Sequence, residues 1–379
     1  MNPLAAVHGN LLVVRPPVPA TCNKAGANYK SEVTHLTYSP RQAYDEWLSI
    51  LDGIVACGGD ALYAFEAVDL PFLGHVGLEV DGDGAIRPAG AREVLGNLAD
   101  VMTGRVFTAN GPWVTRHQHQ LRAVMPNMLA HRRIEAPYYT DLLAEVAHAA
   151  GLELEVIANP HPWEGMADVA AVGDEVVLTY AVPGHYDEGL AAKSPRSTLA
   201  GVTFAADQSG VPEAARRYAE LVYPHFHGDT VHFSARPGTG APVLVHYPGG
   251  LWRDGSATLG AALHHALVPI ERDDAVEQYA GNSRQVASGV LVPDGVSTGF
   301  VATLEGLGLP CHRVPLFELF GKAGGGPACA TLYLPDNLEV PGDAPFRYSA
   351  SRDRVRARRD QVPATLTVSP EFFQGKSRG

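Results

Sequence analysis

The sequence predicts an α/β fold in which one small module of helix and strands recurs around a common core. Helical and strand-like hydrophobic patterns alternate along the 379 residues. Short polar motifs beside the predicted turns recur at intervals of roughly fifty to sixty residues, an interval that suits five propeller-like modules. A doubly wound sheet would also show the alternation, but the sequence has neither a Gly-x-Gly-x-x-Gly motif after a strand nor a phosphate-binding loop.

Three segments have apolar residues spaced three and four apart, as a helix with one buried face requires. In one of them, Leu142, Leu143, Val146 and Ala149 fall on a single face. The predicted helices span residues 40–51, 138–150 and 211–222. Runs typical of strands, most of them bounded by Gly, Asp or Pro, span residues 153–158, 175–180, 242–247, 289–292 and 329–334.

The composition excludes several classes of protein. The chain has 46% hydrophobic residues, and its 29 Lys and Arg against 41 Asp and Glu give a net charge of −12, which argues against a nucleic-acid partner. No apolar run is long enough to span a membrane, and the apolar run near the N-terminus, residues 11–14, is too short for a signal peptide. We therefore expect a cytoplasmic protein without a membrane partner.

Cysteine usage favours a single working thiol over a disulfide framework or a zinc site. The four cysteines are scattered and form no Cys-x-x-Cys pair. A thiolate is a strong nucleophile, so one of them becomes a candidate for catalysis. The cysteines are Cys22, Cys57, Cys311 and Cys329.

Five polar motifs sit in or beside the turns of the predicted modules. Their key residues follow one another at 54, 63, 55 and 47 positions. If the modules surround an axis, one turn from each can meet there, which would bring distant residues together. The key residues are Asn110, Glu164, His227, Asn282 and Cys329.

These residue types suit chemistry on a planar cation. Cys329 closes a segment that begins with three glycines, which let the backbone approach a substrate closely. His227 can act as general acid and base. The carboxylates of Glu164, Asp168 and Asp229 can hold a planar cation through paired hydrogen bonds. A planar cation whose electrophilic carbon lies between nitrogens is a guanidinium, so we expect arginine or a relative as the substrate.

Each candidate also has a simpler interpretation. Cys329 could begin a buried strand. His227 could be a core histidine, and His225 and His232 compete for its role. Asn282, which we take as a substrate-binding candidate, could be an ordinary turn former.

Two His-x-His pairs raise the question of a metal site. They are His225 with His227, and His117 with His119. No third ligand of suitable spacing accompanies either pair, so we expect no metal.

The motifs, in this order, resemble those of the guanidine-modifying, or pentein, superfamily. The resemblance is strongest to the branch of arginine dihydrolases, dimethylarginine hydrolases and amidinotransferases. Its members carry Phe-Thr-Ala-Asn, Glu-Gly-x-Gly-Asp, His-Leu-Asp-Thr and a Lys-Ala-Gly-Gly-rich run that ends at the catalytic Cys. The resemblance covers roughly residues 106–334, with Ala167 in place of the second motif's later Gly and Gly228 in place of Leu. The matching segments are residues 107–110, 164–168, 227–230 and 322–329.

The resemblance implies a five-bladed α/β propeller of ββαβ modules, without metal or organic cofactor. It also implies that Cys329 attacks the guanidinium carbon and forms a covalent amidino-thioether. His227 would move protons with Glu164 as its partner. The implied substrate-binding residues are Asp168 and Asp229 at the guanidinium nitrogens, Asn110 near the reacting group, and Arg132 or Arg133 at the substrate carboxylate.

We therefore expect a cysteine-dependent hydrolase that acts on the guanidino group of arginine or a related compound. The first alternative is an amidinotransferase that passes the amidino group to an amine. From a different class, the alternative is a catalytically silent pentein-fold protein that binds an arginine-like ligand or a protein. The expected partners are a small cationic guanidino substrate and possible further copies of the chain.

For the domain organisation, we expect residues 1–350 to form a single pentein catalytic domain. Residues 58–96, with Asp-Gly-Asp-Gly at their centre, have the pattern of a hairpin or an insertion. Residues 351–379 begin with closely spaced arginines and end in polar residues, so we expect them to form a polar tail.

Overall fold

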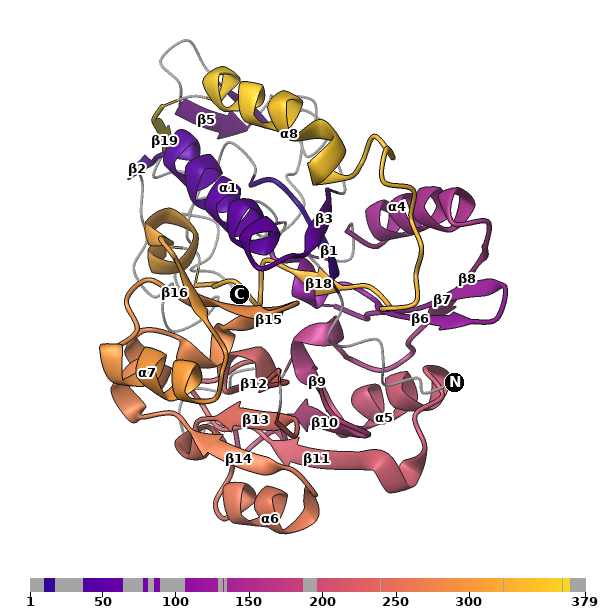
Figure 1. The fold of residues 1–379 in the computed structure, drawn as a ribbon, viewed down its shortest axis with the longest axis vertical. Helices are drawn as coiled ribbons and strands as arrows, with labels where there is room; N and C mark the ends of the chain where they lie inside the picture. Colours follow the sequence, from indigo (N-terminus) through magenta and orange to yellow (C-terminus); the bar gives the residue numbers. More distant parts are fainter. Residues whose placement is uncertain are drawn as a thin grey trace.

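Five three-stranded sheets stand in a ring, with the helices on its outside (Figure 1). A sixth, four-stranded sheet lies beside the ring. The structure is a computed structural model. It describes residues 10–17, 37–63, 78–80, 85–88, 106–128, 132, 135–186, 196–238, 240–322, 324–362 and 364–368.

Four of the five modules have the same ββαβ order. Two antiparallel strands are followed by a helix, and a third strand then pairs parallel to the second. The first such module consists of β6 (Trp113–His117), β7 (Gln120–Met125), α4 (Ala136–Ala149) and β8 (Glu153–Ala158). The others are β9 (Val169–Val172), β10 (Glu175–Tyr180), α5 (Leu199–Gln208) and β11 (Arg216–Glu220); β12 (His232–Ala235), β13 (Val243–His246), α6 (Gly255–Ala262) and β14 (Ala266–Pro269); β15 (Arg284–Val286), β16 (Gly289–Pro293), α7 (Thr298–Gly306) and β17 (Cys311–Val314).

The fifth module is built from both ends of the described chain. Strand β1 (Leu11–Val14) is followed by α1 (Pro40–Ala56) and by β3 (Asp60–Tyr63), which pairs parallel to β1. The remaining strand, β18 (Leu332–Tyr333), pairs antiparallel to β1, with Leu12 opposite Tyr333. This pairing closes the ring.

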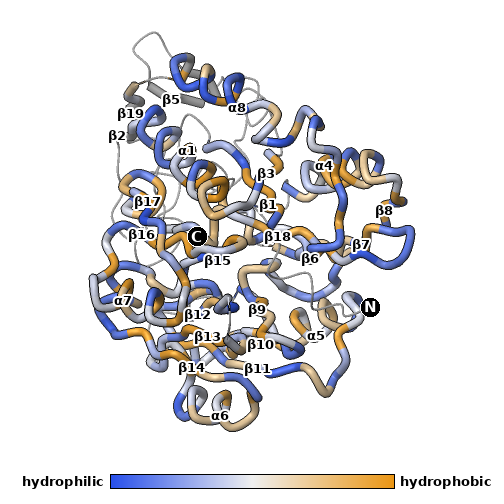
Figure 2. Tube along the Cα trace, in the orientation of Figure 1, coloured by the Kyte–Doolittle hydropathy of each residue, from blue (hydrophilic) through white to orange (hydrophobic). Residues whose placement is uncertain are grey.

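Burial explains why the strands stand in this order. All residues of β1, β9 and β12 are buried, and such short, continuously buried strands suit positions covered on both faces. The third strands β8 and β14 are partly exposed at the rim. Figure 2 shows the same gradient, with hydrophobic segments concentrated on the inner strands and hydrophilic ones at the periphery.

Most of the predicted elements are confirmed. Helices 40–51 and 138–150 are α1 and α4, and the first begins with a Ser39 cap and Pro40. Strands 153–158 and 175–180 are β8 and β10 with the same bounds, and the next two predicted strands are β13 and β16.

Two predicted elements differ. Residues 211–222 are not a helix: they contain a short turn (η6, Glu213–Ala215) and then β11, whose five residues pair in register with β10. The hydrogen bonds to β10 outweigh the helical spacing of the apolar residues. A strand at the rim of the ring tolerates the same spacing. The strand expected at 329–334 is limited to β18, because residues 327–330 form the turn that carries Cys329.

The segment expected as a polar tail is, at its start, part of the fold. Helix α8 (Tyr348–Ala357) buries Tyr348 and Val355, and it packs against α1. Its arginines, which suggested a solvated tail, reach acids on α1: Arg352 and Arg356 pair with Asp52. These ion pairs join α8 to α1, although the arginine side chains stay partly exposed to water.

A four-stranded sheet lies outside the ring, at the top of Figure 1. It includes an antiparallel pair of strands within residues 58–96, where a hairpin or an insertion was expected; residues 64–77, 81–84 and 89–96 lie outside the described part. Its strands are β2 (Thr37–Tyr38), β19 (Leu366–Val368), β5 (Ala85–Pro88) and β4 (Leu78–Val80).

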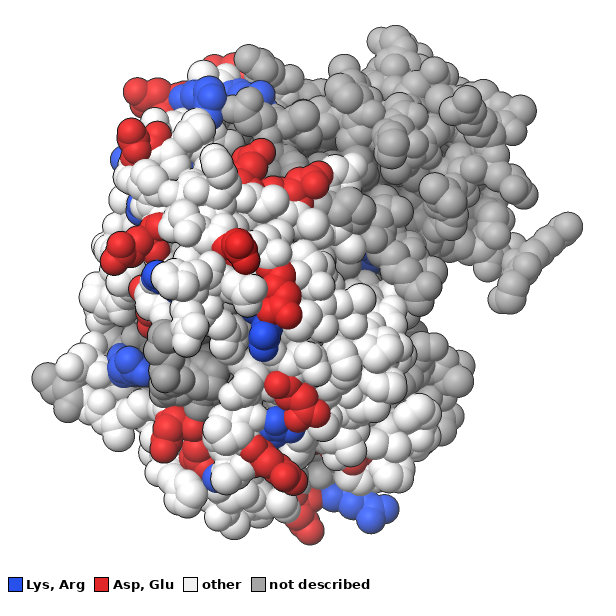
Figure 3. All heavy atoms as spheres, turned by 90° about the vertical axis from the view of Figure 1, so that its right-hand side faces the viewer, with Lys and Arg blue, Asp and Glu red and all other residues white. Residues whose placement is uncertain are grey.

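On the face shown in Figure 3, acidic side chains recur from top to bottom, and basic ones stand singly between them. This distribution agrees with the net charge of −12. Among the described helices, none combines the length and the apolar character needed to cross a membrane.

A tight turn precedes the first strand of every module. Hydrogen bonds join each turn to the next: Ala109 N to Cys329 O (3.0 Å), Met166 N to Gly111 O (3.3 Å), Gly228 N to Asp168 Oδ1 (2.8 Å), Asn282 Nδ2 to Asp229 O (2.8 Å) and Ala328 N to Asn282 O (2.9 Å). The bonds form a closed circle, which we call the turn ring. Its turns are η3 (Thr108–Asn110), η5 (Gly165–Asp168), η7 (Gly228–Thr230), η10 (Ala280–Asn282) and residues 327–330.

Gly165 shows how closely the turns pack. Its φ of +80° lies in the left-handed region, and a Cβ at this position would overlap the carbonyl oxygen of Gly111 in the neighbouring turn. Gly151 has a similar φ of +67°, but nothing lies within 4 Å of its would-be Cβ.

We predict that Gly165→Ala lowers the free energy of unfolding by about 3 kcal/mol or more, because backbone strain and overlap with Gly111 add together. Gly151→Ala is the matched control. It carries only the left-handed strain and should cost about 1 kcal/mol. Urea denaturation followed by circular dichroism measures both; equal losses would show that the contact between turns contributes nothing.

Candidate active site

The turn ring brings the residues singled out in the sequence to one end of the inner strands. Asn110, Asp168, Asp229 and Asn282 lie in its short turns, Glu164 and His227 immediately precede two of them, and Cys329 lies in the fifth. All seven are buried. Because every module contributes its turn at the same end, residues far apart in sequence meet here.

The Cys329 sulfur lies between an amide and a carboxylate. Asn282 Nδ2 donates to it over 3.0 Å, and the thiol in turn donates to Asp229 Oδ2 at 3.1 Å. Asn282 Oδ1 accepts the main-chain N–H groups of Gly326 (2.9 Å) and Cys329 (3.1 Å). Asn282 is therefore a turn residue, as its simpler interpretation states, and it also contacts the thiol directly.

The glycines before Cys329 are required by close packing. A Cβ on Gly325 would overlap the ring of Phe107, and a Cβ on Gly326 would lie 2.8 Å from Asn282 Oδ1. The glycine run thus lets the backbone pass between Phe107 and Asn282 and positions the sulfur.

The thiol and its carboxylate neighbour both have raised pKa values. Burial, followed by the negative charge of Asp229, raises the pKa of Cys329 well above its usual range. Burial also raises the pKa of Asp229, although the nearby His227 opposes this shift. The pair therefore retains a proton in this structure, and Cys329 is a thiol.

His227 forms a buried pair with Glu164. The distance from His227 Nε2 to Glu164 Oε2 is 2.7 Å, and Arg196 Nη1 donates to the same oxygen at 3.1 Å. Burial by itself would raise the pKa of Glu164, but Arg196, His227 and Arg132 outweigh it and hold this pKa well below the usual range. Because Nε2 donates to an ionised Glu164, Nδ1 is the ring nitrogen left to exchange protons.

Asp168 is held by the protein on both oxygens. Oδ1 accepts from Thr179 Oγ1 (2.9 Å) and from Gly228 N (2.8 Å), and Oδ2 accepts from Ser197 Oγ (2.5 Å). The bond to Gly228 fixes the turn that follows His227. Asp168 thus anchors this turn, and its expected contact with the guanidinium stays a prediction.

Arg132 is also buried and engaged. It makes a two-pronged pair with Glu135 (2.8 and 3.1 Å), and its Nη1 donates to Asn110 Oδ1 at 2.6 Å. Its charge and hydrogen bond thus fix the amide of Asn110, whose Nδ2 donates to Glu164 O at 3.1 Å. Arg132 thus supports Asn110 in this structure, and its expected role at the substrate carboxylate stays a prediction. Arg133 lies outside the described residues.

Sequence reasoning missed several residues of the site. Arg196 and Ser197 follow no pattern, and only the fold shows that they reach Glu164 and Asp168. Thr179 reaches Asp168 from the adjacent strand β10. Glu135 had a usable signal, because it lies three residues after Arg132, a spacing at which opposite charges pair.

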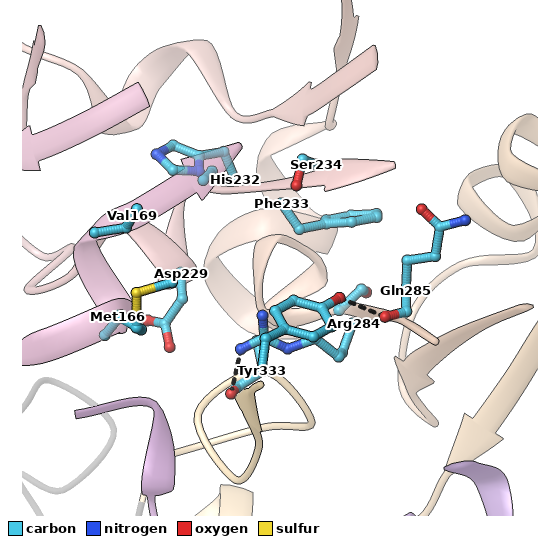
Figure 4. Close-up of a pocket in the computed structure, with 13 residues that line it drawn as sticks. Met166, Val169, Asp229, His232, Phe233, Ser234, Arg284, Gln285 and Tyr333 are labelled. Carbon is cyan, nitrogen blue, oxygen red and sulfur yellow. Dashed lines mark hydrogen bonds between the residues drawn. The ribbon is translucent and has the colours of Figure 1, made fainter. Parts of the chain in front are cut away.

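The competing histidines have other surroundings. His225 shares a hydrogen bond with Thr230 at 3.2 Å, and burial lowers its pKa to about 4. His232 lines a small cavity, together with Asp229 (Figure 4). His225 and His227 therefore take separate partners in this structure.

One group elsewhere has the residue types of a metal site. Ligand atoms of Asp174, Glu175 and His265 lie within 4.8 Å of one another, at the outer hairpin of the second ββαβ module. Arg217 already pairs with Glu175, which reduces the charge available to an ion. We propose no metal there.

Neither a protein-family model nor a curated protein matches the sequence. Solved structures do match the fold. The substrate-bound N-terminal domain of ArgZ, a cyanobacterial arginine dihydrolase, aligns with a TM-score of 0.58 and 19% identity over 85% of this chain and 97% of that domain. AgrE in complex with ornithine and NAD+ aligns with a TM-score of 0.56 and 19% identity, over 88% of this chain and 40% of AgrE. A dimethylarginine dimethylaminohydrolase adduct aligns with a TM-score of 0.55 and 13% identity, over 86% of this chain and 99% of that one. These likenesses confirm the five-module α/β propeller.

We predict that Asp229→Asn lowers the pKa of the Cys329 thiol, because the carboxylate that raises it is removed while an amide can still hydrogen-bond to the sulfur. The rate of alkylation of Cys329 by iodoacetamide should then begin to rise at lower pH. Quantitative mass spectrometry of the peptide that contains Cys329 separates this thiol from the other three. An alkylation profile at the pH of the unchanged protein would contradict the coupling.

Proposed function

Since the chain has the fold of the pentein, or guanidino-modifying, superfamily, we propose that it is a hydrolase acting on the guanidino group of arginine or a related compound, with Cys329 as the nucleophile. The observation that carries the proposal is the arrangement at the turn ring: a buried thiol beside an under-compensated carboxylate, close to a His–Glu pair. The names of the structural neighbours, an arginine dihydrolase and a dimethylarginine dimethylaminohydrolase, support the same substrate class.

Asp229 is the carboxylate best placed to bind the cation. Its Oδ2 faces the Cys329 sulfur, and its Oδ1 is buried without a hydrogen-bond partner among the described residues. A guanidinium placed over the sulfur would pair with this carboxylate and offset the cost of its burial. Since both oxygens of Asp168 already accept hydrogen bonds, we assign Asp168 to the anchoring of the His227 turn.

Binding of the cation also prepares the nucleophile. In the free protein, the negative charge of Asp229 opposes ionisation of the thiol. A guanidinium neutralises that charge and favours the thiolate beside its own electrophilic carbon. The reactive thiolate thus forms mainly when substrate is present, which limits side reactions of a free nucleophile.

The reaction then proceeds through two displacements at one carbon. The Cys329 thiol gives its proton to Nδ1 of His227, and its sulfur bonds to the guanidinium carbon. A C–N bond then breaks, and the nitrogen leaves as ammonia with that proton. His227 next takes a proton from water, whose oxygen bonds to the same carbon. The C–S bond breaks, and Cys329 returns as the thiolate. Glu164, kept ionised, stabilises the protonated form of His227 between the two steps.

Arg132 takes a positioning role in this proposal. Its guanidinium pairs with Glu135 and donates to Asn110, so it orients the Asn110 amide beside Glu164 and His227. Asn110 in turn lies near enough to the His227 ring, with Nδ2 at 3.4 Å from Nε2, to restrict its orientation.

We predict that incubation with arginine and a panel of guanidino compounds releases ammonia and a ureido product for at least one of them. Cys329→Ala should reduce turnover by a factor on the order of 10³ or more, because no other group can form the covalent intermediate. Intact mass spectrometry after rapid acid quench should show an adduct on the native protein and none on the variant.

Cys311→Ala is the matched control, because this half-buried thiol lies on β17, outside the turn ring. It should retain both turnover and the adduct. A new guanidino compound that forms only with an added amine would indicate an amidinotransferase. Binding without adduct or turnover for every compound would overturn the proposal in favour of a binding protein.

A further inference from the structure

A small cavity lies beside Asp229, among the inner strands of four modules. We call it the axial cavity (Figure 4). Its volume is about 20 Å³, which is the room that one water molecule needs. Asp229 both contacts the sulfur and lines the cavity. The wall comes from β9, β12, β15 and β18 and includes Val169, His232, Ser234, Arg284, Gln285 and Tyr333.

Two groups on this wall lack a protein partner. Neither ring nitrogen of His232 has a hydrogen-bond partner among the described residues, and the residue is 3% exposed. Asp229 Oδ1 is likewise buried without one. Leaving a buried polar group unpaired costs roughly 1–3 kcal/mol, so such groups normally bind an ordered water molecule where the protein offers no partner.

The charge state of His232 suits a neutral occupant. Burial, and then the neighbouring His246, lower the pKa of His232 to about 3, so the ring is neutral near pH 7. A neutral imidazole has one N–H donor and one acceptor nitrogen, which matches water. Arg284 does not compete for these groups, because it donates to Thr331 and Ala328 and lies over the Tyr333 ring.

We propose that the axial cavity binds one ordered water molecule, held by His232 and Asp229, and that His232 thereby acts as a positioning residue for the carboxylate beside the nucleophile. The water solvates Asp229 Oδ1, while Oδ2 faces the sulfur. It stabilises the ionised carboxylate, which can then pair with a guanidinium. The catalytic part of this inference rests on the proposed function; the water site itself does not.

The test uses the native protein, two variants at position 232 of β12 and one control variant on the paired strand β13. His232→Phe should fill the cavity and displace the water, and His232→Gln should keep polar atoms there. Val245→Ala is the matched control, because it changes a buried apolar residue that does not line the cavity. Crystal structures show the occupant. Alkylation of Cys329 as a function of pH reports the charge of the Asp229–Cys329 pair without any turnover.

We predict density for one water in the native cavity and none in His232→Phe. Loss of the water destabilises ionised Asp229, so the carboxyl group keeps the proton that it shares with the thiol. The alkylation of Cys329 by iodoacetamide should therefore shift to lower pH by about half a unit, a threefold higher rate on the rising limb. His232→Gln and Val245→Ala should stay at the native profile. The charged groups that face the pair, His227 and Arg284, and His246 beside His232 are the same in all variants.

A dry native cavity, or a His232→Phe profile equal to the native one, would overturn the inference. If thermal unfolding shows that the Phe variant does not fold, His232→Met, which is more adaptable in shape, replaces it. Absence of turnover in the native protein would overturn the proposed function and leave both readouts of the water site intact.

Discussion

The site depends above all on the hydrogen bonds that join the five turns into a circle. Each turn is short, and its shape is fixed by the turn before and the turn after it, so a sulfur, an imidazole and three carboxylates are placed by one shared constraint. Catalytic groups need placement to within fractions of an ångström, and loops that contact only solvent rarely provide it. In this protein, hydrogen bonds between the turns fix the position of each one.

The buried carboxylates of the site differ in how far the protein compensates them. Glu164 has Arg196 and His227, and Glu135 has Arg132 and Arg15. Asp168 accepts bonds on both oxygens. Asp229 has a thiol and, among the described residues, no cation within a salt bridge, so its burial remains the least compensated. Binding of a planar cation would compensate it most simply. Asp229 is therefore the carboxylate of the site at which the proposed function places the cation.

The sequence indicated the chemical groups that meet in the turn ring, and it indicated the framework strands around them less completely. Cys329, His227 and Glu164 stand out because their residue types and spacing carry chemistry, while β9 and β12 are short apolar runs that no periodicity distinguishes. Residues 211–222 were mispredicted as a helix because their pairing with β10 is a tertiary interaction, which the local sequence pattern does not show. The roles of Asp168 and Arg132 depend on Ser197 and Glu135, contacts made only after folding. Patterns therefore identify chemical groups, and packing decides which of them remain available.

The pairing of β18 with β1 affects when the site can form during folding. Cys329 lies three residues before β18, and β1 lies near the other end of the described sequence, so the nucleophile reaches its place only when the two ends have met. Contacts between residues so far apart in sequence form late in folding, because closing the long loop costs entropy before the contact can stabilise the chain. Under the proposed function, a chain still emerging from the ribosome has a histidine and carboxylates but no Cys329 nucleophile in position.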